Sequence, residues 1–95
     1  MDSTEELIKQ VARDVVLLLL EKNKSYGDTA NNPPQIFSKL SAKEGILARL
    51  DDKLSRIKNK GLNDKTEDTI SDIIGYLILY KVQVRKEELI KKKEK

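Results

Sequence analysis

The 95-residue chain has no cysteine, no histidine and no tryptophan, and these absences exclude several kinds of site. Without cysteine or histidine there is no disulfide framework, none of the usual zinc sites, and no thiol or imidazole catalysis. A bound metal would have to be a hard cation held by carboxylate oxygens. No apolar run approaches the roughly 18 residues that span a bilayer, and the acidic start at residues 1–6 is unlike a signal peptide. We therefore expect a cytoplasmic protein with no membrane partner.

The formal net charge of +3 is confined to the end of the chain. Residues 85–95 contain six Lys or Arg and three Glu, whereas the preceding 84 residues contain 13 charges of each sign. A protein that follows the phosphates of a duplex needs more cations, clustered on one face. We therefore expect no duplex nucleic acid as a partner. The sequence predicts one domain over residues 1–84 and a charged helix end or tail over residues 85–95.

Three capping boxes divide the sequence, and each has a Ser or Asp followed three residues later by a Glu. They are Ser3 to Glu6, Ser41 to Glu44 and Asp64 to Glu67. After each box, apolar residues recur at helical spacing. The first pattern stops near Asn23, the second is followed by Gly61 as a C-terminal cap, and the third continues through residue 84 into the charged tail. The fold is therefore expected to be all-α, with three main helices.

The segment between the first two expected helices, residues 24–40, is too long for a simple helical hairpin. It contains Tyr26-Gly27-Asp28 and the pair Pro33-Pro34, which prevents a continuous helix. Compact domains seldom carry such a loop without a use. Two interpretations remain open here: the loop contributes to a binding site, or Tyr26, Ile36 and Phe37 close one end of the bundle.

The first and third expected helices are apolar nearly all round at residues 15–20 and 73–80. Helices of that kind are covered on more than one side. A chain of this length cannot cover both by itself, so the pattern predicts a homo-oligomer, most simply an antiparallel dimeric bundle.

Two polar strips are the candidates for function. Arg49, Asp52, Lys53 and Arg56 share one arc of the second helix, and Asp68, Asp72 and Tyr76 share a strip of the third, next to Gly75. The two strips are expected to face each other or a common cleft. They either form an ion-pair network or bind a phosphate, which guanidinium forks and a lysine suit well. In the second case Tyr26 and Tyr76 are candidates to stack on a base.

Four parts of the chain together resemble the nucleotide modification associated domain 1 family, which is common in phage genomes. The resemblance covers roughly residues 7–82. It is carried by Lys24-Ser25-Tyr26-Gly27-Asp28, by Asn31 and Phe37, by the run from Arg49 through Lys53 to Arg56, and by the run from Glu67 through Asp68 and Asp72 to Tyr76. It implies a phage-type protein that handles nucleotides in the cytoplasm of the bacterial host.

A second resemblance is to the all-α nucleoside triphosphate pyrophosphohydrolases of the MazG type. Their metal site uses carboxylates on two helices. In this sequence the second helix presents cations where those carboxylates are expected, and only Asp52 and, less plausibly, Asp51 remain beside Asp68 and Asp72. Hydrolysis with release of pyrophosphate normally needs Mg²⁺ held by several carboxylates. This departure favours holding a phosphate over activating water.

The sequence thus predicts a protein that holds or sequesters a nucleotide or cyclic nucleotide immune signal in a cleft of a helical homo-oligomer. Binding without turnover is favoured, and no catalytic residue is assigned. Two alternatives remain: a Mg²⁺-dependent nucleotide hydrolase or accessory protein in nucleotide modification, and a purely structural interaction module. The predicted ligand-binding residues are Tyr26, Asp28, Asn31, Arg49, Lys53, Arg56, Asp68, Asp72 and Tyr76.

Overall fold

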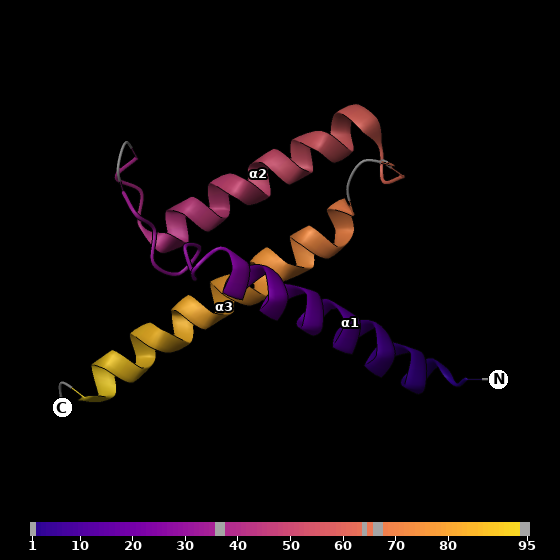
Figure 1. Cartoon of the computed structure of the whole chain (residues 1–95), viewed down its shortest axis with the longest axis horizontal. Coiled ribbons are helices and arrows are strands. Elements are labelled where there is room, and N and C mark those ends of the chain that lie inside the picture. The colour runs from indigo at the N-terminus through magenta and orange to yellow at the C-terminus, as the bar shows by residue number, and fades with distance from the viewer. Residues whose placement is uncertain (1, 36–37, 64, 66–67, 94–95) are drawn as a thin grey trace.

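A computed structural model describes residues 2–35, 38–63, 65 and 68–93 of the chain. It consists of three helices, α1 (Thr4–Ser25), α2 (Ala42–Lys60) and α3 (Thr69–Lys93), connected by a long loop and a shorter one (Figure 1). The all-α prediction is confirmed. Within the described part, none of the helices combines the length and the apolar character needed to span a bilayer.

The ends of α1 follow from its caps. The hydroxyl of Ser3 accepts a hydrogen bond from the amide of Glu6 at 3.2 Å, which satisfies a donor of the first turn. At the other end the amide of Tyr26 still donates to the carbonyl of Lys22 at 2.9 Å. The chain then turns through Gly27 and Asp28, both with positive φ (67° and 58°). The helix is therefore a little longer than the apolar pattern predicted.

The second helix, α2, starts and stops where its sequence indicates. Ser41 and Glu44 form the complete capping box, with the amide of Glu44 donating to the Ser41 hydroxyl and the amide of Ser41 donating to the Glu44 carboxylate. Gly61 ends the helix with φ at 80°, a conformation that favours glycine, and its amide donates to the carbonyl of Ile57.

The start of α3 differs from the predicted one. The capping box expected at Asp64 and Glu67 lies outside the described residues, and α3 begins only at Thr69. The residue that caps it is Asp68, whose carboxylate accepts hydrogen bonds from the amide of Ser71 at 3.1 Å and from its hydroxyl at 2.8 Å. At its other end α3 runs on to Lys93, so the charged tail is helical at least that far.

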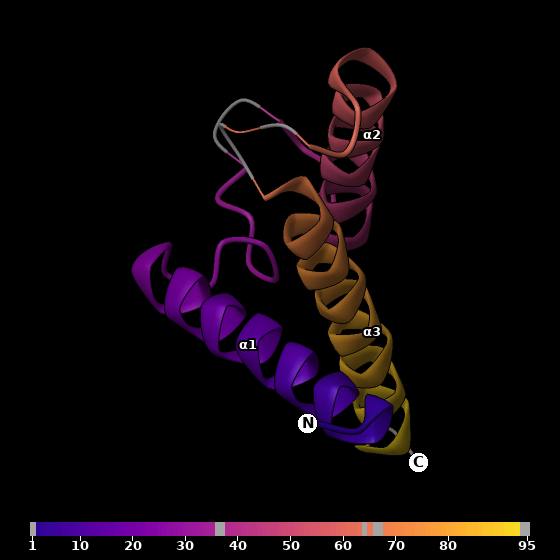
Figure 2. The same ribbon diagram turned by 90° about the vertical axis from the view of Figure 1, so that its right-hand side faces the viewer.

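The helices α2 and α3 run in opposite directions side by side, whereas α1 crosses α3 and its N-terminal end reaches away from both (Figures 1 and 2). The core between α2 and α3 is built on Ile46, Leu50 and Leu79. Gly75 is buried on α3, and a Cβ placed there would lie 3.4 Å from Leu19 of α1. Gly75 therefore lies at the contact between α3 and α1, where even a Cβ would touch the opposite helix.

The loop after α1 is held against the other helices. Ala30 packs on the core, and Gln83 of α3 donates to the carbonyl of Asn31 at 3.3 Å. These contacts bring Tyr26 and the following residues to the place where α1, α2 and α3 meet. Of the three residues expected to close one end of the bundle, Ile36 and Phe37 lie outside the described part, and Tyr26 is exposed.

Candidate functional site

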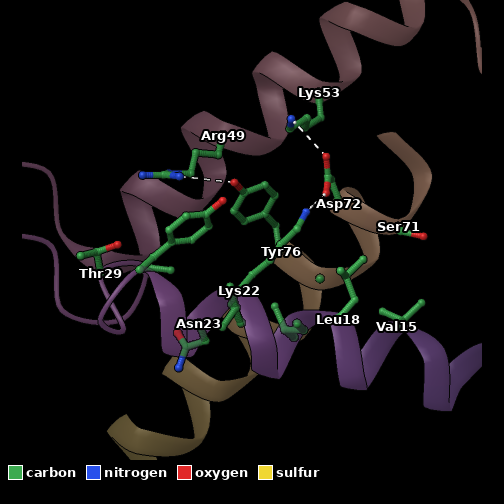
Figure 3. A pocket seen from close by; sticks show the side chains of 15 residues that line it. Val15, Leu18, Lys22, Asn23, Thr29, Arg49, Lys53, Ser71, Asp72 and Tyr76 are labelled. Carbon is green, nitrogen blue, oxygen red and sulfur yellow. Dashed lines mark hydrogen bonds and ion pairs between the residues drawn. The ribbon is translucent and has the colours of Figure 1, made fainter. Parts of the chain in front are cut away.

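A cavity of about 320 Å³ lies where the three helices and the turn after α1 come together (Figure 3). Its apolar wall is formed by Val15, Leu18, Leu19, Ala30, Gly75 and Leu79. Its polar lining consists of Lys22, Asn23, Tyr26, Thr29, Arg49, Lys53, Ser71, Asp72 and Tyr76. The volume is at the lower end of the range typical of small-molecule sites.

Asp72 is the centre of the charged part of this cavity. One carboxylate oxygen accepts from Nζ of Lys22 at 2.9 Å and the other pairs with Nζ of Lys53 at 3.3 Å. The Asp72 side chain is only 12% exposed and that of Lys53 only 17%. Because Lys22 belongs to α1, Lys53 to α2 and Asp72 to α3, one carboxylate connects all three helices through ion pairs (Figure 3).

The charge of Lys22 is stabilised by this arrangement. Its hydrogen bond to Asp72 raises the pKa of the ammonium group above the usual 10.5, and the attraction of the carboxylate adds to the rise, while partial burial opposes it. Lys22 is therefore positively charged at neutral pH. An anion entering the cavity meets this ammonium group already in place.

Arg49 lies at the solvent-exposed side of the cavity and is oriented by an aromatic residue. Its guanidinium group donates a hydrogen bond of 3.3 Å to the hydroxyl of Tyr76, and its central carbon lies 5.9 Å from the centre of the Tyr76 ring. No carboxylate in the described part of the chain pairs with Arg49. A guanidinium group has five N–H donors in a planar fork, so most of them remain available to an anion.

Five of the nine predicted ligand-binding residues line this cavity: Tyr26, Arg49, Lys53, Asp72 and Tyr76. Parts of the two polar strips therefore face a common cavity: Arg49 and Lys53 of α2, and Asp72 and Tyr76 of α3. This agreement is physical: on two packed helices, residues one turn apart on the same arc meet the same neighbour.

The other four predicted residues, Asp28, Asn31, Arg56 and Asp68, lie outside the lining. Asp28 accepts a hydrogen bond from the side chain of Asn32 at 2.7 Å within the loop. Asn31 offers its carbonyl to Gln83. Arg56 is half-buried on α2, one turn beyond the cavity. Asp68 caps α3, and the hydrogen bonds from Ser71 lower the pKa of its carboxyl group below the usual 3.8.

Sequence reasoning missed the contribution of α1 and its end, namely Lys22, Asn23 and Thr29, and also Ser71 of α3. A signal for Lys22 was present. It lies four residues after Leu18 and three after Leu19, and therefore on the apolar face of the helix. A lysine in the last turn of a helix, on its apolar face, lies next to the surface on which that face packs.

The ion-pair alternative is realised in part. Asp72 does pair with Lys53, as that alternative expected, but its second partner is Lys22 rather than Arg49 or Arg56. Asp68 accepts its described hydrogen bonds from Ser71. Arg49 contacts Tyr76. The cations around the cavity are thus partly paired, and the space between them is open rather than filled by apolar side chains.

The carboxylates proposed for a magnesium site are not gathered at one place. Asp72 lines the cavity, Asp68 caps α3, and Asp52 is exposed on α2 outside the lining. Among the residues that the structure describes, no group of three acidic side chains is arranged to hold a metal ion. The donor set around the cavity is mainly cationic and suits an anion.

Comparison of the chain with family models, with curated proteins and with solved structures found no match.

Proposed function

We propose that the cavity binds the phosphate of a nucleotide or cyclic nucleotide and holds it without turnover. The observation that carries this proposal is the position of Arg49. Its guanidinium group is oriented by Tyr76 at the open side of a cavity that also contains Lys22 and Lys53. A fork of N–H donors next to two ammonium groups matches the oxygens of a phosphate.

The aromatic residues suit the other half of a nucleotide. Tyr26 and Tyr76 both line the cavity, and Tyr26 is 65% exposed. Aromatic faces stack on nucleic bases whatever the base, so two tyrosines near a cationic group favour a base with a phosphate attached. The apolar wall next to them excludes water from one side of the ligand.

Asp72 sets the condition under which binding occurs. Lys22 and Lys53 share this one carboxylate, and the Lys22 side chain is 42% exposed, so its ammonium group can reach an incoming oxygen as well as Asp72. The phosphate competes with Asp72 for these donors but does not need to remove it. Asp72 thus stabilises the two lysines in the free protein, while its negative charge opposes the binding of an anion.

The resemblance to the nucleotide modification family is compatible with this proposal. Residues from three of its motifs, Tyr26, Arg49 with Lys53, and Asp72 with Tyr76, line one cavity. In that context the protein acts in the cytoplasm of a phage-infected bacterium. It either sequesters a host immune nucleotide or presents a nucleotide to a modifying enzyme.

The two alternatives receive less support. A magnesium-dependent hydrolase needs several carboxylates near the phosphate, and among the described residues Asp72 is the carboxylate that lines the cavity. A purely structural module accounts for the ion pairs of Asp72, but not for an arginine held over a tyrosine ring at an open cavity.

Binding is tested by thermal shift and calorimetry with a panel of nucleoside phosphates and cyclic dinucleotides, with and without Mg²⁺. A ligand at a hundred times its Kd stabilises the folded protein by about 2.7 kcal/mol. We expect Arg49→Gln to raise Kd about tenfold or more, because a charged hydrogen bond is worth roughly 1.5–3 kcal/mol. Lys58→Gln, which removes one charge on α2 outside the cavity, should leave Kd unchanged.

The same samples separate the alternatives. Chromatography of the nucleotides after incubation should return them intact; magnesium-dependent products that disappear in Asp72→Asn would support the hydrolase instead. If no compound in the panel shifted the melting temperature of the wild-type chain, the structural module would become the better explanation. Mass spectrometry of small molecules released from denatured protein identifies the ligand itself.

A further inference from the structure

The chain exposes far more surface than a compact monomer of its size. Its accessible area is 7851 Å², whereas a folded monomer of 10.9 kDa exposes about 5,600 Å². The radius of gyration is 15.7 Å, compared with about 12 Å for a compact domain of this length. Roughly 2,300 Å² is therefore left uncovered relative to a monomer that has folded on itself.

Part of this uncovered surface is a groove between the N-terminal half of α1 and the middle of α3. The groove has a volume of about 490 Å³ and is lined by Leu7, Ile8, Val11, Ala12, Ile74 and Ile78, among others. Ile8 is 64% exposed and Val11 is 58% exposed. In Figure 1 this part of α1 extends away from α2. The apolar face that covers the cavity at the C-terminal half of α1 thus continues, uncovered, toward the N-terminus.

The chemistry of the groove indicates what covers it. Apart from Thr4, its lining is apolar, so it lacks the polar groups that orient a small ligand. The remaining surface of α1 carries both signs of charge, with Glu5, Glu6 and Asp14 as well as Lys9 and Arg13. A helix that lies on an anionic membrane has a basic polar face instead. An apolar helical surface of the same kind, from another protein chain, is the occupant that fits.

We propose that the α1–α3 groove binds α1 of a second copy of this chain, related by a two-fold axis. The excess area of the whole chain is enough for the roughly 1,000–2,500 Å² that each partner buries in an obligate dimer, and the groove with the neighbouring apolar face of α1 is part of it. In a two-fold interface the same surface patch of both copies takes part, so the patch must provide both a groove and the ridge that fills it. The N-terminal half of α1 satisfies this condition, because its apolar face is at once a wall of the groove and an exposed ridge.

Two residues define the geometry of this interface. Ala12 lies among larger residues in the groove, and its small side chain allows a crossing helix to approach closely. Val15 is buried and lines both the groove and the cavity described above. In the proposed dimer the second copy therefore packs against Val15, which separates the groove from the cavity. This contact holds α1 in place on α3.

The first test is the mass of the full-length chain in solution, measured by sedimentation velocity from 1 to 100 μM. We expect the wild-type chain to be a dimer or a larger assembly of dimers. In a two-fold dimer both copies carry Val11→Glu, so two carboxylates without a partner would be buried in the interface. The variant should therefore raise the dimer Kd about 100-fold or more. Gln10→Glu adds the same charge at the preceding position of α1, outside the groove, and should leave the mass of the assembly unchanged.

A second experiment, cross-linking through introduced cysteines, remains informative if the dissociated chain does not fold. The protein has no cysteine, so a single introduced cysteine reports its own contacts. Under oxidation, Val11→Cys or Ala12→Cys should give a covalent dimer, because a disulfide needs Cα atoms within about 7 Å. Gln10→Cys should give little covalent dimer under the same conditions.

Each of four results would overturn the proposal. A wild-type chain that is folded and monomeric at 100 μM would leave the groove to a different partner. Equal dissociation of the dimer by Gln10→Glu and Val11→Glu would place the contact elsewhere. The same conclusion would follow if Leu17→Glu dissociated the dimer and Val11→Glu did not, since Leu17 is 59% exposed but lies outside the groove. Equal cross-linking at positions 10, 11 and 12 would indicate random collision.

Discussion

At the scale of single residues, the ion pairs of Asp72 combine structural and functional roles. Its carboxylate is nearly buried and contacts two lysines from two other helices. Removing the carboxylate of such a cluster takes away the anion that both lysines share, which costs more than the pairing itself contributes. The same carboxylate lowers the positive charge that a phosphate meets. Stability and ligand affinity are therefore expected to respond to Asp72 in opposite directions.

We predict that Asp72→Asn destabilises the fold by about 1–3 kcal/mol, because it leaves Lys22 and Lys53 without their shared anion. If the cavity only holds a phosphate, the variant should bind it as tightly as the wild type or more tightly. The measurements are urea unfolding and calorimetry at the same pH. Asp51→Asn, on the exposed side of α2, serves as the control and should change stability by less than about 0.5 kcal/mol. An unchanged stability in Asp72→Asn would show that the ion pairs contribute nothing.

The residue scale also shows where sequence reasoning was limited. Asp68 and Asp72 are one turn apart and were predicted to act together. The structure gives them different tasks because α3 begins at Thr69: Asp68 precedes the helix and accepts from Ser71, whereas Asp72 lies inside the helix and faces the lysines. A helix beginning a few residues earlier would have placed both carboxylates on its surface. The position of a helix start was the missing information.

At the scale of the elements, the caps define the helices. Ser3 and Ser41 were predicted as caps and are caps, since a hydroxyl at that position satisfies local amides whatever the tertiary structure. Asp68 performs the same function for α3, with two hydrogen bonds from Ser71. Its contribution is open to a direct test, because Asp, Asn and Ala differ in a known way at this position.

We predict that Asp68→Ala destabilises the protein by about 1 kcal/mol at pH 7, and that Asp68→Asn, which keeps an acceptor, costs only a few tenths of that. The folded-state pKa of Asp68 is lowered below 3.8, so its charge stabilises the fold above pH 3.8 and this contribution is lost as pH falls through the folded-state pKa. The difference between wild type and Asp68→Asn should therefore shrink below pH 3.8 in denaturant titrations. A constant difference from pH 7 down to pH 2 would contradict the role of the charge.

At the scale of the whole molecule, the described apolar core is small, with Val15, Ile46, Leu50 and Leu79 as its buried apolar residues. Many large apolar side chains remain exposed along α1 and α3. In the proposed dimer, association adds to this small core, and the stability of the protein then depends on its own concentration.

We predict that the melting temperature of the wild-type chain rises by about 4 °C for each tenfold increase in protein concentration, as expected for two-state melting of a dimer of 190 residues in total. The measurement is calorimetry from 5 to 500 μM at constant pH and salt. Gln10→Glu should show the same dependence. A melting temperature independent of concentration over this range would mean that the isolated chain is stable in the form described.

The sequence by itself determined the three helices, though not where α3 begins, because caps, apolar spacing and turn residues act over a few positions along the chain. It also identified the types of residue at the cavity on α2 and α3, since one turn of a helix places them on one face. Only the tertiary structure decided that α1 supplies Lys22 to the same carboxylate as Lys53, and that Asp28, Asn31, Arg56 and Asp68 lie outside the cavity. The reason is that the crossing of α1 over α3 depends on contacts between residues some fifty positions apart, such as Lys22 with Asp72, and no local pattern encodes them.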